Sequence, residues 1–188
     1  MASPSSETDI CNLALQRLGA KAISNLSEDS TAGRECNRVY AHARDSELRA
    51  HPWNFARARV SIAADSTAPA FGFDLQYDLP SDYLRILPDS EVTDWQIEGR
   101  KILTNDTAPL QLVYLKRVTD PNEFDELFID LLVARIALDI CEKVTQSNTK
   151  KEEAASRYTA VKKEAKRVNA FENTSKNGPT DEWITARL

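Results

Sequence analysis

Five side chains in this sequence are of the types that most often do chemistry, but their spacing matches no familiar reactive site. The cysteines, Cys11, Cys36 and Cys141, are far apart, and no pair has the close spacing of a zinc or redox site. The histidines, His42 and His51, belong to no metal-binding His–Glu motif. A helix would place Cys36 and His42 on different faces, so a Cys–His nucleophile could form only between elements. We therefore expect buried structural thiols and no metal, cofactor or catalytic residue.

The motifs of phosphate-binding and acyl-transfer enzymes are missing from the sequence. It contains neither the glycine-rich loops that cradle phosphates nor the nucleophile elbow of the α/β hydrolases. Carboxylates are plentiful, with 29 Asp or Glu residues. A glycosidase needs a facing pair of them, one with a raised pKa, and linear spacing does not reveal such a pair. A cell-wall-degrading enzyme is therefore an alternative, to be discriminated by two facing carboxylates in a cleft.

Charge is unevenly spread along the chain. The net charge is -5, yet residues 148–170 hold seven Lys or Arg against three Glu, a local charge of +4 that leaves -9 elsewhere. A basic helix on an acidic body fits electrostatic pairing between copies of the chain, and it equally fits a solvated helix face. The acidic total argues against a tight grip on duplex DNA, and Tyr158 is the one aromatic in the basic stretch. A DNA-binding packaging factor is a second alternative.

Apolar periodicity predicts four helices, over residues 6–18, 30–51, 121–145 and 148–171. Ser5 or Ser6 is expected to cap the first helix, and Gly19 to end it in a left-handed conformation. Pro52 ends the second helix, because proline disfavours helical geometry in the preceding residue. Asp120 is expected to cap the third helix. The last helix carries a narrow apolar seam, which is typical of one helix lying along another.

Between the second and third helices, residues 57–118 are predicted to form an antiparallel β insertion. The clearest hairpin covers residues 95–104, with Gly99 at the first central position of a type II′ turn. This turn pairs Ile97 with Ile102, and Glu98 with Lys101 in the next cross-strand pair.

The predicted fold class is α+β and helix-dominated: a bundle of about four helices, the β insertion and an extended C-terminal tail. We assign residues 1–171 to a single domain and residues 172–188 to an extended C-terminal arm. The first residues lack the basic and apolar regions of a signal peptide, and no apolar run is long enough to cross a bilayer. We therefore expect synthesis in the cytoplasm.

Short segments in a fixed order carry a resemblance over nearly the whole chain. They are Ile10–Leu15, Leu18–Gly19, Leu26–Ser30, Cys36–Tyr40, Arg44–Asp45, Leu48, His51–Ala56, Tyr77–Arg85 and Trp183–Arg187. Each segment is short, and the specificity lies in their shared order and spacing. On these segments the chain resembles the head-to-tail adaptors of tailed bacteriophages, the tail tubular protein A-like connector family.

That resemblance implies a structural ring subunit and not an enzyme. Such adaptors form a ring, commonly of about twelve copies, beneath the portal protein. The ring extends the DNA channel, docks the tail or nozzle protein and passes genomic DNA without sequence-specific contact. We therefore expect this chain at the head–tail junction of a virion, after synthesis in the host cytoplasm.

The resemblance also assigns candidate residues. In this family the C-terminal segment often embraces the portal, which here implies an arm over residues 173–188 with the contacts Trp183, Ile184, Arg187 and Leu188. An unstructured end with an incidental tryptophan is the alternative. The candidate residues of the subunit interface are Arg44, Asp45, Arg49, Lys162 and Lys166, because a closed ring repeats each ion pair around its circumference.

Overall fold

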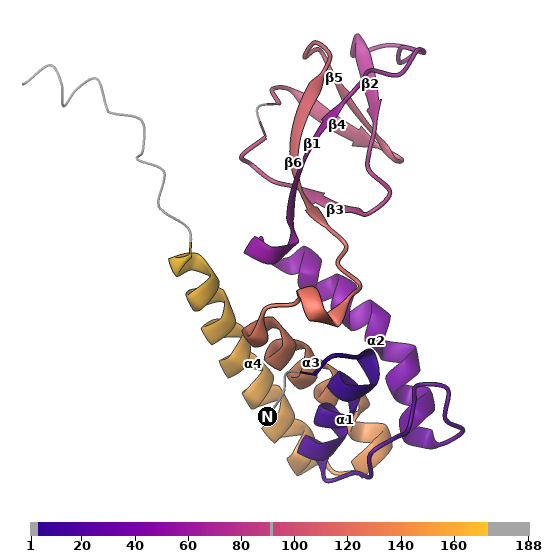
Figure 1. The fold of residues 1–188 in the computed structure, drawn as a ribbon, viewed down its shortest axis with the longest axis vertical. Coiled ribbons are helices and arrows are strands. Elements are labelled where there is room, and N and C mark those ends of the chain that lie inside the picture. The colour runs from indigo at the N-terminus through magenta and orange to yellow at the C-terminus, as the bar shows by residue number, and fades with distance from the viewer. Residues whose placement is uncertain (1–3, 91, 173–188) are drawn as a thin grey trace, which may run out of the picture.

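A helical bundle carries a β insertion at one end in the computed structural model, which describes residues 4–90 and 92–172 (Figure 1). Within these ranges the helices are α1 (Glu7–Leu18), α2 (Thr31–Ala50), α3 (Glu126–Thr145) and α4 (Asn148–Phe171). The strands are β1 (Arg57–Ile62), β2 (Leu75–Asp78), β3 (Tyr83–Ile86), β4 (Trp95–Glu98), β5 (Lys101–Thr104) and β6 (Leu110–Lys116). The predicted α+β, helix-dominated fold is confirmed, and the arm predicted beyond Glu172 lies outside the described residues. None of the described helices is long and apolar enough to span a bilayer.

Local capping explains where the first two helices begin and end. Ser6 caps α1, since its hydroxyl accepts a hydrogen bond from the Asp9 amide at 3.1 Å. Gly19 ends α1 with φ at 72°, the left-handed conformation that the sequence predicted there. Ser30 caps α2 by accepting from the Gly33 amide at 3.0 Å. Gly33 has a second role, because a Cβ atom there would lie 2.5 Å from the Glu28 carbonyl oxygen.

The start of the third helix was predicted one turn too early. Asp120 caps a short 3-10 turn, η2 (Pro121–Glu123), by accepting from the Asn122 amide at 2.9 Å. The chain then leaves helical geometry at Phe124, which is 8% exposed and packs its ring 5.2 Å from that of Phe128. Asp125 caps α3 itself. Burial of the Phe124 ring therefore interrupts a helix that local sequence favours from Pro121 onward.

The insertion consists of two antiparallel three-stranded sheets, ordered β1-β6-β3 and β2-β5-β4. The predicted hairpin is confirmed: Ile97 lies opposite Ile102 and Glu98 opposite Lys101, with Gly99 at φ 59°. The division into two sheets was not predicted. It depends on β6 pairing with both β1 and β3, and those partners are distant in sequence.

The bundle and the insertion are each stabilised by a cluster of buried apolar side chains of their own. The bundle core gathers α1, α2 and α3 around residues such as Ile10, Leu48, Phe128 and Ile136, all 0% exposed. The insertion core lies between the sheets and is formed by Tyr77, Leu79, Ile86, Ile102, Leu110, Leu112 and Tyr114. Leu115 of β6 and Leu84 of β3 belong to the bundle core, so the first sheet connects the two clusters.

Candidate interaction surfaces

The three cysteines belong to the buried core of the bundle. Cys11, Cys36 and Cys141 are buried free thiols, as the sequence predicted. A hydrogen bond with Cys36, together with burial, raises the pKa of Cys11, which disfavours its thiolate. In the described ranges, no group of three or more His, Cys, Asp or Glu side chains could hold a metal ion. The remaining candidates are surfaces that could bind another molecule.

The segment His51–Ala56 forms the junction between the bundle and the insertion. Trp53 is 1% exposed, and its indole N–H donates to the Glu47 carbonyl oxygen at 2.8 Å. Its ring packs edge-on against Phe128 at 5.3 Å and against His51 at 4.6 Å. The following 3-10 turn, η1 (Asn54–Ala56), leads directly into β1. The tryptophan therefore fixes the direction in which the insertion leaves the bundle.

The same junction holds the C-terminal end of α4 (Figure 1). The Asn54 amide N–H donates to Asn169 Oδ1 at 3.0 Å, and Asn54 Nδ2 donates to the Asn169 carbonyl at 2.9 Å. Asn169 Nδ2 lies 3.1 Å from His51 Nε2. Burial lowers the pKa of His51, and the nearby cations Lys166 and Arg85 lower it further, which favours the neutral ring. Residues 173–188 therefore start at the base of the insertion.

A buried carboxylate cluster, which sequence reasoning missed, links α2, α3 and α4. Glu47 is 2% exposed, and its Oε1 accepts from Tyr158 OH at 2.6 Å and from Arg135 Nη1 at 3.1 Å. Lys162 Nζ lies 3.1 Å from Glu47 Oε2 and donates to Tyr158 OH at 2.6 Å. Burial opposes the charge of Lys162, but its hydrogen bonds to Tyr158 and Glu47 raise its pKa. We call Glu47, Arg135, Tyr158 and Lys162 the Glu47 cluster.

The predicted interface residues of α2 make contacts within the chain. Arg44 is 7% exposed, and its guanidinium lies 2.9 Å from Asp45 and 3.7 Å from Glu7 of α1. Asp45 also accepts from Arg117 Nε at 2.8 Å. Arg49 donates from Nη1 to the Leu84 carbonyl oxygen of β3. These three side chains connect α2 with α1, with β3 and with the chain that follows β6.

The predicted interface residues of α4 also have neighbours within the chain. Lys162 belongs to the Glu47 cluster, and Lys166 is half-buried beside His51. Arg44, Asp45, Arg49 and Lys162 thus all make hydrogen bonds or ion pairs within the same chain. A ring contact that used them would have to share side chains that already have partners.

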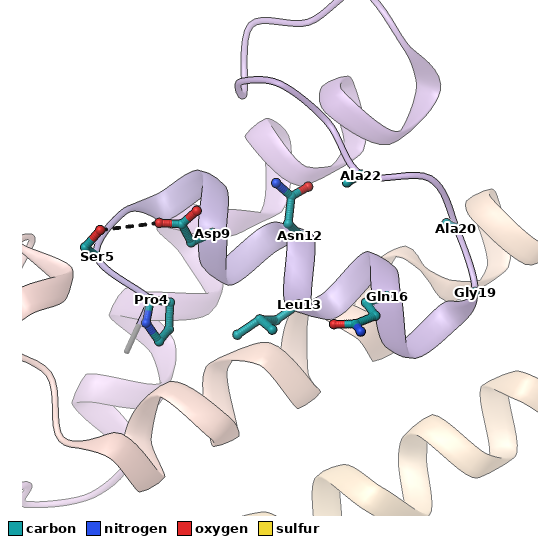
Figure 2. A pocket seen from close by; sticks show the side chains of 9 residues that line it. All are labelled: Pro4, Ser5, Asp9, Asn12, Leu13, Gln16, Gly19, Ala20 and Ala22. Carbon is teal, nitrogen blue, oxygen red and sulfur yellow. Dashed lines mark hydrogen bonds between the residues drawn. The ribbon is translucent and has the colours of Figure 1, made fainter. Parts of the chain in front are cut away.

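An open groove of about 750 Å³ runs along the outer face of α1 and the link that follows it (Figure 2). Asn12 and Asp9, two of its polar side chains, already have partners. Asn12 Nδ2 donates to the Ile23 carbonyl at 3.0 Å, while Asn12 Oδ1 accepts from the Ile23 amide at 2.8 Å. Asp9 accepts from the Ser6 hydroxyl at 2.7 Å. This surface therefore holds the link against α1 and carries no array of polar groups aimed at a ligand.

A second groove, of about 510 Å³, lies between the C-terminal end of α1, the middle of α3 and the first half of α4. Its floor is apolar, with Leu18 at 4% and Ala134 at 2% exposure, and Arg17, Lys150 and Arg157 line its walls. We call it the basic groove. Sequence reasoning recognised the positive charge of α4 but not this site, because α1 supplies one of the cations.

Two large apolar side chains of the insertion are exposed. Phe71 is 87% exposed in the loop before β2, and Trp95 is 43% exposed at the start of β4. The insertion lies opposite the helical bundle along the long axis of the molecule (Figure 1). Aromatic side chains are enriched at protein interfaces, so these two are candidates for contact with another molecule.

Comparison with known proteins gives this chain no family. No family model matches it, and the curated proteins contain no significant match. Its function has therefore to be argued from its own residues.

Proposed function

We propose that this chain is a structural head-to-tail adaptor of a tailed bacteriophage, a ring subunit beneath the portal that extends the DNA channel and docks the tail. The basis is the resemblance of the chain's ordered segments to the adaptor family. No family model matches the chain, so that comparison adds no support.

The strongest support for the proposal is that one connected body presents two separate surfaces. The insertion, which carries the exposed Phe71 and Trp95, lies at one end of the molecule, and the bundle lies at the other (Figure 1). The His51–Ala56 junction joins these ends through Trp53 and Asn54, which hold β1 and α4 to the bundle. A subunit that bridges two assemblies needs surfaces facing two ways and a firm connection between them. The chain beyond Glu172 leaves from that connection.

The alternatives gain no specific support from the described residues. Each of the four grooves found there is lined by a single carboxylate, namely Asp9, Asp89, Glu153 or Glu98. A glycosidase would need two facing carboxylates in one cleft. The cations of α4 are divided between the Glu47 cluster, the basic groove and exposed positions, so they form no continuous track for a duplex.

In the mechanism we propose, assembly occurs on a template. A ring contact joins unlike surfaces of neighbouring copies and closes only at a fixed rotation, which a symmetric portal supplies. Free chains then stay separate until a portal is present. The arm with Trp183, Ile184, Arg187 and Leu188 holds each copy to the portal.

The test is the size and shape of the purified chain with and without its cognate portal, by light scattering and electron microscopy. We expect an added cyclic ring on the portal, and loss of that ring when residues 173–188 are deleted. Absence of any association with the portal would reject the adaptor proposal and direct attention to cell-wall hydrolysis. Rings that form without portal would reject the template mechanism alone.

A further inference from the structure

Three cations, Arg17, Lys150 and Arg157, line the basic groove together with one carboxylate, Glu153, so positive charge is in excess there. Arg17 pairs with Asp130 at 2.6 Å, and Lys150 Nζ donates to the Leu18 carbonyl oxygen at 2.7 Å. Arg157 is exposed and makes no hydrogen bond or ion pair within the described part of the chain. Burial, and also the Arg157 guanidinium, lower the pKa of Arg17 despite the bond to Asp130, so the two cations repel each other. An anionic group placed between them would relieve that repulsion.

The floor of the groove sets a second requirement for the molecule that binds there. Leu18, Ala134 and Ala137 are at most 4% exposed and form an apolar surface between the cations. A bare phosphate would satisfy the cations but leave this floor uncovered. A peptide that combines carboxylates with an adjacent large apolar side chain would satisfy both.

This chain itself contains such a peptide. Residues 181–184 read Asp-Glu-Trp-Ile, two carboxylates followed at once by two large apolar side chains. No other stretch of the sequence places two adjacent acidic residues directly before a tryptophan. The charges of this segment and of the groove are opposite, and its apolar residues match the apolar floor.

The segment also has the reach to fold back. Arg157 precedes Glu172 by fifteen residues on α4, which is about 22 Å along a helix. The nine residues from Glu172 to Asp181 can span about 30 Å in an extended chain. Asp181 can therefore reach Arg157 within the same chain, with Trp183 beyond it over the floor.

We propose that the basic groove of Arg17, Lys150 and Arg157 is the docking site of the chain's own segment Asp181–Ile184, which folds back along α4 in the free protein. Asp181 and Glu182 pair with the cations, and Trp183 covers Leu18 and Ala134. This docking does not rest on portal binding, and it stands if the adaptor proposal fails. If both hold, the portal competes with the groove for the same segment.

Acrylamide quenching of tryptophan fluorescence tests the proposal in the full-length chain. Trp95→Phe leaves two tryptophans, of which Trp53 is 1% exposed and shielded, so quenching reports Trp183. We expect quenching several-fold weaker than in a free peptide of residues 173–188. Arg157→Glu should raise the quenching of Trp183 to the level of the peptide. The double variant Arg157→Glu with Glu182→Arg should lower that quenching again, because it restores an opposite charge pair. Since Arg157 makes no hydrogen bond or ion pair with residues 4–90 or 92–172, the helical circular dichroism should not change.

Lys163→Glu is the matched control, because it makes the same charge change at an exposed position of α4 outside the groove. Full quenching of Trp183 in the unaltered groove would overturn the proposal, as would equal effects of Lys163→Glu and Arg157→Glu. Protection that arises only as protein concentration increases would assign the groove to a second copy and overturn docking within one chain. Binding of a short DNA duplex that depends on Arg157 and leaves Trp183 quenching unchanged would assign the groove to phosphates instead.

Discussion

We expect removal of the Glu47 side chain to lower the free energy of unfolding of the bundle more than removal of any other side chain of similar size. Glu47→Ala removes the acceptor shared by Tyr158 and two cations, and it leaves the half-buried Lys162 without its counter-charge and Arg135 with Asp139 alone. Breaking a buried ion pair from one side lowers the free energy of unfolding by about 3–5 kcal/mol. Urea denaturation followed by circular dichroism measures this loss.

Asp139→Ala is the matched variant that separates the effect of burial from the effect of charge. Asp139 also pairs with Arg135, at 2.8 Å across one turn of α3, but its side chain is 27% exposed. Asp139→Ala should therefore cost at most about 1 kcal/mol, as partly exposed pairs do. Equal losses for the two variants would show that the Glu47 cluster adds nothing beyond an ordinary surface pair.

His51 should make stability depend on pH in the weakly acidic range. Its folded-state pKa is lowered, by burial and by the cations Lys166 and Arg85, so the unfolded chain binds the proton more tightly. Stability is then fully present above the unfolded pKa of about 6.5 and falls as the pH decreases toward the folded pKa. Protonation also removes Nε2 as the acceptor for Asn169.

The measurement is the free energy of unfolding between pH 8 and pH 5 for the natural chain and for His51→Gln. The natural chain should lose more stability over this range than the variant. Lys166→Ala should reduce that difference, because it removes one of the two cations that disfavour the charged ring. A wild-type slope no steeper than that of His51→Gln would reject the assignment.

Among the elements, α3 depends on a cap that local sequence does not single out. Asp125 accepts from the Leu127 amide at 2.9 Å and from the Phe128 amide at 3.2 Å. Asp125→Ala should therefore lower the free energy of unfolding by about 1 kcal/mol, within the usual range of 0.5–2 for a lost cap. Asp120→Ala should cost less, because it affects the 3-10 turn η2 and not α3. The opposite order of the two losses would restore Asp120 as the cap of the helix.

The features predicted correctly depend on neighbours in the sequence. Ser6 and Gly19 mark the ends of α1, and Gly99 sets the hairpin, because the relevant hydrogen bonds form within a few residues. The features missed depend on distant partners. Glu47 continues the helical spacing of the buried Tyr40 and Ala43, and a carboxylate at that spacing was the available signal for the Glu47 cluster.

The candidate interface residues show the same limit. The sequence suggested Arg44 and Asp45 for contacts between subunits, but their partners Glu7 and Arg117 come from α1 and from the chain after β6. The basic groove needs α1 beside α4, which no local pattern specifies. Lys150 and Arg157 already indicated positive charge there, while the contact of Lys150 with the Leu18 carbonyl depended on the fold. The portal-binding residues Trp183, Ile184, Arg187 and Leu188 lie outside the described residues and stay a prediction.

At the scale of the whole molecule, the two buried clusters raise the question of whether the insertion and the bundle unfold together. A matched pair of residues tests this, since Ile102 of the insertion core and Ile136 of the bundle core are both 0% exposed. Replacing either by alanine should cost about 2–5 kcal/mol at its own site. Hydrogen exchange shows which amides lose protection in each variant.

We expect Ile136→Ala to increase exchange throughout the chain, because the insertion is anchored on the bundle through Leu84 and Leu115. Ile102→Ala should increase exchange mainly within residues 57–116 and leave the amides of α2 and α3 protected. Equal increases everywhere in both variants would instead show one cooperative unit. For an adaptor the expected asymmetry has a consequence: the bundle can stay closed in a ring while the insertion, which carries Phe71 and Trp95, adjusts to whatever docks on it.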